Sequence, residues 1–289
     1  MPRKSVLSRP LPTADRAAGV GDGKRHRSRW SLGSRTFLLR AIVPVAVLAS
    51  WQLYSVVLSP SLFTPPPIEV FTALLNLPFE PGFVEAAGGT LLALAYGFGL
   101  AVLLGIPAGL IAGRVRLLGA IAGGYVGLLL TIPMASLVPV IIVLFGIGLE
   151  ARVAVVFAFA LPLLVGDVMA GASSVPRGLL EMGRSFGCGR WQLGRRVIFP
   201  AALPEIFAGL RLSAARAVIG MVVAELIVIS SGLGGMVTVF LARYQMDKAY
   251  AITFVFLIIS GLLVGFVQYL ESRFLNWRSS KEGAVHAAI

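Results

Sequence analysis

Six long apolar runs constrain this sequence more than any other feature. They cover residues 37–58, 90–112, 120–146, 151–172, 205–230 and 250–271. A helix needs about 20 apolar residues to cross a lipid bilayer, and the runs lack the short alternation typical of β-barrel strands. Only 13% of the residues are charged, against about 25% in soluble domains. The sequence therefore predicts an all-α, polytopic membrane protein with about six transmembrane helices.

The third run is irregular because Pro133 and Pro139 interrupt it. A proline removes a backbone donor and bends a helix. Irregular backbone at membrane depth persists only where it is buried in protein or lines a water-filled cavity. We therefore expect Pro133, Ser136 and Pro139 to line a translocation pathway, with a kink that serves packing alone as the alternative.

The basic residues predict the orientation of the chain. With the N-terminus in the cytoplasm, 22 of the 25 Lys and Arg lie on the cytoplasmic side, and the reversed orientation would place those 22 outside. Cytoplasmic loops of membrane proteins carry an excess of Lys and Arg. Both termini are therefore expected in the cytoplasm. This distribution indicates an orientation signal and contact with anionic lipid, and we expect no binding of nucleic acid.

The chain divides into three predicted parts. Residues 1–35 are basic, rich in Ser, Gly and Pro, and expected to form a disordered cytoplasmic tail. Residues 36–275 form the transmembrane domain, and residues 276–289 form a cytoplasmic C-terminal tail. Within the domain, the longest cytoplasmic loop is 173–204.

Loop 173–204 has the pattern of two short helices separated by a glycine turn. A helix is predicted over 175–186, Gly187 and Gly189 end it, and a second helix follows over 188–199, before Pro200 and Pro204. The loop exposes arginines beside Trp191, and Trp and Arg are enriched at protein interfaces. This pattern favours docking on a soluble partner; a loop that lies on lipid headgroups is the alternative.

The same loop resembles the EAA motif of ABC-transporter permease subunits. Glu181, Gly187 and Pro200 stand at the motif's positions for Glu, Gly and Pro. PPPIEVFTALLNL, IPMASLVPVIIVLFGIG and AELIVISSGLGGMV extend the likeness. Over residues 37–275 the chain resembles the nitrate/sulfonate/taurine group of importer permeases.

This resemblance implies the permease subunit of an ABC importer in a bacterial plasma (inner) membrane. The substrate would be a small solute, in particular a small anion such as a sulfonate, taurine or nitrate. The implied partners are a second permease copy in a homodimer, a separate ATP-binding subunit that holds ATP and Mg, and a periplasmic or lipid-anchored substrate-binding protein. The implied ATPase-coupling residues are Glu181, Arg184, Gly187, Arg190, Trp191 and Pro200.

Sequence motifs for chemistry within the chain are missing. There is no phosphate-cradling P-loop, no nucleophile elbow and no metal-binding pair of histidines on one helix. The single cysteine and two histidines do not form a ligand cluster. We therefore expect no catalytic residue, metal or cofactor in this chain, and no enzyme activity. An ion-coupled secondary transporter, which needs repeats and midplane ionisable groups, and a membrane-embedded enzyme are the alternatives.

Two carboxylates lie inside predicted spans, where burying a charge is costly. Asp167 is expected to pair with a nearby arginine. Glu225, within AELIVISSGLGG, is the fourth pathway candidate: it either lines the pathway or holds the glycine-rich end of the fifth span.

Overall fold

The computed structural model describes residues 31–58, 63–227 and 231–275, and side-chain surroundings from residue 42 onward. Two units are distinguished, residues 1–49 and 50–289. Every regular element in the described residues is a helix, which confirms the all-α prediction. The C-terminal tail and residues 1–30 of the predicted N-terminal tail lie outside the described residues. Residues 31–35, assigned to that tail, are helical, because α1 runs from Ser31 to Leu53.

Four helices in the described residues are long and apolar enough to cross a membrane. They are α3 (Phe83–Arg114), α6 (Leu149–Ser173), α9 (Phe199–Ile227, continuous with the short turns from Arg190) and α11 (Met246–Phe274). At about 1.5 Å per residue, the shortest, α6, is about 37 Å long and exceeds the hydrocarbon thickness. These helices confirm four of the predicted spans.

The remaining two predicted spans are not among these four helices. The first, 37–58, is helical throughout, in α1 and a π-helical turn at Tyr54–Leu58, and the stretch of it whose side chains are described, Ile42–Val57, is apolar. The third span is broken into α4 (Arg116–Thr131), a 3₁₀ turn (Met134–Leu137) and α5 (Val138–Phe145), with a bend of 91°. The count of six spans therefore stays a prediction.

The right-angle bend confirms the predicted irregularity of the run over 120–146 and is larger than a simple kink. Ile132 has extended backbone angles, φ −69° and ψ 134°. A residue that precedes proline is driven from the helical to the extended region by a clash with the proline ring. Pro133 thus ends α4, and the chain restarts at a new angle.

Helices α3, α6 and α9 pack closely because small residues separate them. Their shared core contains Ala93, Ala160, Ala217 and Met221. A Cβ atom on Gly97 of α3 would lie 2.6 Å from the Cβ of Val156 on α6. Small residues that allow such approach are typical of helix contacts in membranes.

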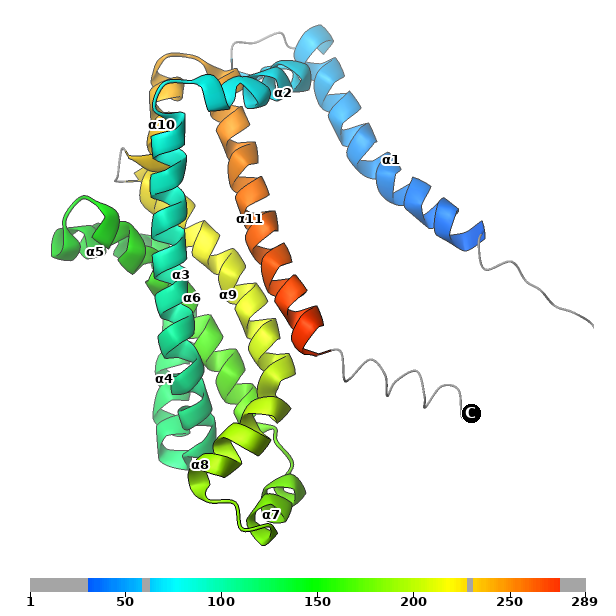
Figure 1. Cartoon of the computed structure of the whole chain (residues 1–289). Coiled ribbons are helices and arrows are strands. Elements are labelled where there is room, and N and C mark those ends of the chain that lie inside the picture. The colour runs from blue at the N-terminus through cyan, green and yellow to red at the C-terminus, as the bar shows by residue number, and fades with distance from the viewer. Residues whose placement is uncertain (1–30, 59–62, 228–230, 276–289) are drawn as a thin grey trace, which may run out of the picture. The chain divides into compact units, whose positions relative to one another are not determined.

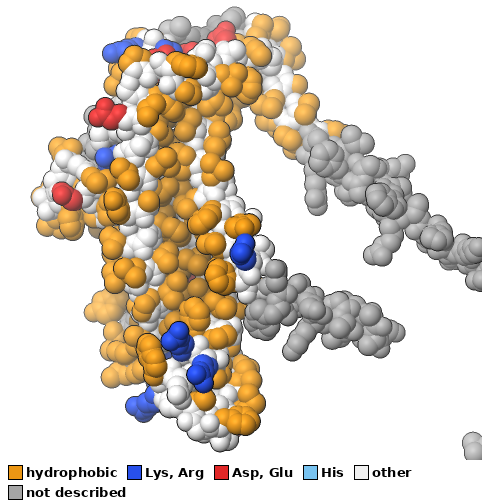
Figure 2. Space-filling view, viewed as in Figure 1, with side chains coloured by type: hydrophobic (Ala, Val, Ile, Leu, Met, Phe, Trp, Pro, Cys, Tyr) orange, Lys and Arg blue, Asp and Glu red, His pale blue; other side chains and the backbone are white. Residues whose placement is uncertain are grey.

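Short helices lie at both ends of the 50–289 unit. At one end α2 (Pro67–Asn76), a 3₁₀ turn (Leu77–Phe79) and α10 (Gly232–Ala242) pack on α11 around Val70, Leu77, Leu233 and Ile252. At the other end lie α7 (Arg177–Ser185) and α8 (Arg190–Leu193) (Figure 1). Hydrophobic side chains cover the visible face between them, and several Lys and Arg side chains lie near the α7–α8 end (Figure 2).

Candidate functional site

The predicted pattern of helix, glycine turn and helix is confirmed in loop 173–204. Gly187 has φ +77°, its N–H donates to the carbonyl of Arg184 at 2.9 Å, and the N–H of Cys188 donates to the carbonyl of Gly183 at 3.1 Å. This pair of bonds is the Schellman ending of a helix, which favours glycine because a Cβ is strained at positive φ. Gly187 therefore turns the chain from α7 towards α8.

A small apolar core fixes this loop to the transmembrane helices. Buried Leu180, Leu193 and Ile198 pack with Ala172 and Val175, and Leu110 of α3 lies against them. Gly183 allows the close approach, since a Cβ there would lie 2.7 Å from a methyl group of Leu193. The loop is thus packed directly against α3, α6 and α9.

Pro200 does not end the helix before the fifth span, contrary to our expectation. It is the second residue of α9, and a π-helical turn at Gly194–Ile198 directly precedes it. Proline has no N–H to donate to the preceding turn, and wide π-type turns accommodate such defects. The chain is therefore helical without interruption from Arg190 to Ile227.

The outer surface of the loop combines exposed aromatic and charged side chains. Phe186 is 81% exposed and Trp191 is 80% exposed. We call this the α7–α8 surface and define it by its exposed members: Glu181, Met182, Arg184, Phe186, Arg190, Trp191, Arg195 and Arg196. Two such large apolar groups beside arginines are typical of a surface that binds protein.

The predicted pathway residues of the third span lie in its broken segment and are exposed. Pro133 precedes the 3₁₀ turn, Ser136 lies in that turn, and Pro139 is the second residue of α5. The hydroxyl of Ser136 donates to the carbonyl of Pro133 at 2.7 Å, and its N–H donates to the same oxygen at 2.8 Å. The carbonyl oxygen of Pro133 therefore accepts its hydrogen bonds from within the turn.

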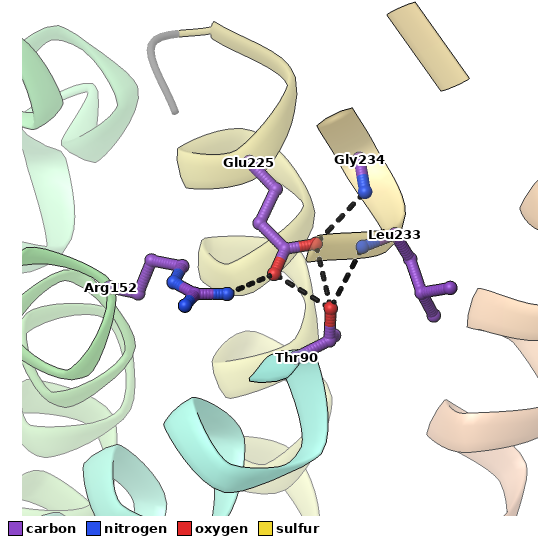
Figure 3. A network of polar contacts seen from close by, with 5 residues as sticks. All are labelled: Thr90, Arg152, Glu225, Leu233 and Gly234. Carbon is purple, nitrogen blue, oxygen red and sulfur yellow. Dashed lines mark hydrogen bonds and ion pairs between the residues drawn. The ribbon is translucent and has the colours of Figure 1, made fainter. Parts of the chain in front are cut away.

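Glu225, in contrast, is buried in a network of four helices (Figure 3). The residue is 1% exposed. Its carboxylate accepts from Thr90 Oγ1 of α3 at 2.7 Å, from Arg152 Nη1 of α6 at 3.1 Å, and from the N–H of Gly234 in α10 at 3.0 Å. Thr90 Oγ1 in turn accepts from the N–H of Leu233 at 3.0 Å. The network satisfies two of the free N–H groups at the start of α10.

Two glycines allow the carboxylate to approach α10 so closely. Gly232 has φ +72°, and a Cβ there would lie 2.2 Å from Glu225 Oε1; a Cβ on Gly234 would lie 2.4 Å from the Cβ of Glu225. These contacts agree with the prediction that Glu225 holds the glycine-rich segment after the fifth span. Whether it also borders the pathway stays a prediction.

Arg152 and Thr90 were missed as partners of Glu225, and Asp167 was assigned the wrong partner. Arg152 is one of only three basic residues on the predicted outer side, and this exception to the charge rule was the available signal. Asp167 lies against Gly209 and forms no ion pair with any arginine of the described residues. A group of three His, Cys, Asp or Glu that could bind a metal does not occur among the residues described.

Comparisons with known proteins identify a matching family and several relatives. The family model "binding-protein-dependent transport system inner membrane component" matches residues 105–276, more than half of the chain. The taurine transport system permease protein TauC of Escherichia coli (strain K12) is 29% identical over 259 residues, 88% of this chain and 94% of that protein. The putative aliphatic sulfonates transport permease protein SsuC of Bacillus subtilis (strain 168) is 28% identical over 282 residues, 97% and 99% of the two chains.

The fold also matches a solved transporter. An inward-facing structure of the MetNI methionine ABC transporter contains a chain with 20% identity and a TM-score of 0.58, over 68% of this chain and 98% of that chain. The ion-coupled alternative is not supported by these matches. A permease subunit is not itself an enzyme, because ATP is hydrolysed in a separate ATP-binding subunit. The chain belongs to the family of inner membrane components of binding-protein-dependent transport systems, and it is a permease subunit of an ABC importer.

Proposed function

We propose that this permease carries a small sulfonate, either taurine or an aliphatic sulfonate, across the bacterial plasma membrane. The support is that the relatives named for these two substrates match nearly the whole length of the chain. Nitrate is the other small anion expected from the sequence. Uptake experiments must separate these substrates, because identity below 30% leaves room for a change of substrate.

The α7–α8 surface is the proposed docking site for the ATP-binding subunit. Its exposed aromatic and arginine side chains are the observation that supports the proposed mechanism. Arg184, Arg190 and Trp191 would contact that subunit, and Glu181 and Gly187 would shape the loop. ATP and Mg would be held by the partner. Closure of the ATP-binding subunits would push the loop, and the core around Leu193 would pass the movement to the transmembrane helices.

The proposed assembly is a pair of identical permease chains with an external substrate-binding protein. Both termini are proposed to lie in the cytoplasm, because that orientation places the α7–α8 end and its arginines inside. The α2–α10 end would then face the binding protein. The broken third span, with Pro133, Ser136 and Pro139, would border the pathway, and the Glu225 network would hold the helices together at its outer end.

Co-purification in mild detergent tests the docking proposal. The double variant Arg190→Glu/Trp191→Asp should lose the ATP-binding subunit while it still inserts in the membrane. The matched control is Phe79→Asp, which changes an aromatic side chain that is 85% exposed at the opposite end of the unit. If the ATP-binding subunit remains bound to the double variant, the α7–α8 surface is not its docking site.

Uptake of radiolabelled taurine and alkanesulfonate by cells that express the complete transporter tests the substrate. We expect uptake that depends on the ATP-binding subunit and on the binding protein. Nitrate uptake in the absence of sulfonate uptake would refute the proposed substrate but leave the docking proposal intact.

A further inference from the structure

Arg216 is a cation in the middle part of α9 that has no partner in the part of the chain that the structure describes. Among the cations in the described spans, Arg152 pairs with Glu225, and Arg211 pairs with Glu271 of α11 at 2.8 Å. Arg216 is exposed, and it forms no ion pair or hydrogen bond with the residues that the structure describes. Its charge is therefore not compensated by any of the described residues.

The position of Arg216 along α9 places it inside the membrane. At about 1.5 Å per residue, it lies about 7.5 Å from Arg211 and about 13.5 Å from Glu225, which lie towards the two ends of the span. Two glycines of α9 contact the neighbouring α6: Gly209 lies against Asp167, and Gly220 lies against Phe159. Arg216 lies between these two levels, opposite the middle of α6. A charge at such depth faces lipid only at high cost and normally faces protein or a water-filled cavity.

The side of α9 that carries Arg216 continues towards the broken third span. Val223 lies seven residues further, almost two turns, and hence on the same side. It packs against the cluster around Val138 and Ile142 of α5. Leu212 and Ile219, the neighbours of Arg216 on this side, are 54% and 50% exposed. Arg216 thus shares one exposed strip of α9 with the contact to the predicted pathway segment.

The nearest carboxylate of the packed helices, Glu271 of α11, lies at the level of Arg211, about 7.5 Å from Arg216 along the axis, and is paired with Arg211. Asp167 lies at the level of Gly209, and Glu205 lies against Gly171. These levels are about 10 Å and about 16 Å from Arg216, both towards the α7–α8 end. Among the described residues, therefore, no unpaired carboxylate reaches Arg216, and the two carboxylates beyond it would repel an anion.

We propose that Arg216 binds the sulfonate group of the substrate during its passage between the helices. This inference rests on the proposed substrate. A guanidinium presents a planar fork of N–H donors that binds the oxygens of an anion two at a time. The carboxylates of Asp167 and Glu205 would then disfavour tight binding further along and promote release to the cytoplasm.

Transport by the complete, reconstituted transporter tests the role of the charge. Arg216→Gln should lower sulfonate uptake at least tenfold, while the ATP-binding subunit still co-purifies and ATP hydrolysis is still stimulated by the loaded binding protein. Arg216→Lys should retain more uptake than Arg216→Gln. The control is Arg273→Gln, which removes an exposed arginine at the end of α11 and should transport like the wild type.

Thiol chemistry tests direct contact with the anion. Arg216→Cys should lose uptake, a cationic methanethiosulfonate reagent should restore part of it, and an anionic reagent should not. Saturating sulfonate should slow the labelling of the introduced thiol; the wild-type chain, labelled in parallel, reports the contribution of Cys188.

Two outcomes would overturn the inference. Unchanged sulfonate uptake by Arg216→Gln would show that the charge is not needed. Labelling of the Arg216→Cys thiol that saturating sulfonate does not slow would show that the residue does not contact the anion. A wild-type transporter that carries no sulfonate refutes the proposed substrate instead, and is recognised because it fails before any variant is compared.

Discussion

The buried ion pair of Arg152 and Glu225 makes a quantitative prediction about stability. Their side chains are 10% and 0% exposed, so solvent screens the pair weakly. Removing one partner leaves a buried charge without compensation, which costs about 3–5 kcal/mol. Arg152→Met should therefore destabilise the protein by about 3 kcal/mol, the lower end because the guanidinium retains slight access to solvent.

The double variant Arg152→Met/Glu225→Gln should recover much of this loss. The glutamine oxygen still accepts from Thr90 or Gly234, and no charge remains unpaired. Replacing both members of a buried pair costs far less than removing one, so we expect the double variant within about 2 kcal/mol of the wild type. The four proteins form a double-mutant cycle with a coupling energy above about 1.5 kcal/mol.

Equilibrium unfolding in mixtures of SDS and a mild detergent measures each free energy in the cycle. Circular dichroism follows the helices, and reversibility must be shown by refolding from SDS, because irreversible unfolding gives no free energy. The control is Arg211→Met/Glu271→Gln: this pair is 38% and 29% exposed, and such partly exposed pairs contribute about 1 kcal/mol or less. Additive effects of Arg152→Met and Glu225→Gln would refute the buried pair.

Two further predictions concern glycines. Gly187→Ala should destabilise the α7–α8 loop by about 1 kcal/mol, because alanine is strained at φ +77°; limited proteolysis should then cleave the loop faster, and unchanged cleavage would contradict the strained turn. Gly97→Ala should cost about 1–3 kcal/mol by overpacking against Val156. Gly99→Ala, on the same helix with no atom within 4 Å, should be neutral or stabilising in the same unfolding assay, and equal losses would refute the packing argument.

The sequence predicted those parts of the fold that depend on residues close together in the chain. Length and hydropathy are sufficient for α3, α6, α9 and α11, since a helix that crosses lipid must satisfy its own backbone. Gly187 was predicted to end a helix for the same kind of reason, because a residue at positive φ favours glycine regardless of its distant neighbours.

Contacts between distant parts of the chain decided what the sequence did not predict. Pro133 predicts an interruption, but the 91° bend also depends on the packing of α5 against α6 and α9. Glu225 was recognised as unusual, yet its partners Thr90 and Arg152 are 135 and 73 residues away in sequence. No periodicity links positions so far apart, and only the packed helices bring them together.

The exceptions to the charge rule carry more information than the residues that obey it. Of the three basic residues on the proposed outer side, Arg152 pairs with Glu225, and Lys248 pairs with Glu80 and also lies over the ring of Phe240. Pairing with a carboxylate from a distant element compensates each of these charges, but both residues still count as exceptions to the rule, because carboxylates contribute little to it. Arg216 is the opposite case: it is counted with the cytoplasmic residues, yet it lies opposite the middle of α6 and has no partner among the described residues, which leaves its charge available for the proposed anion.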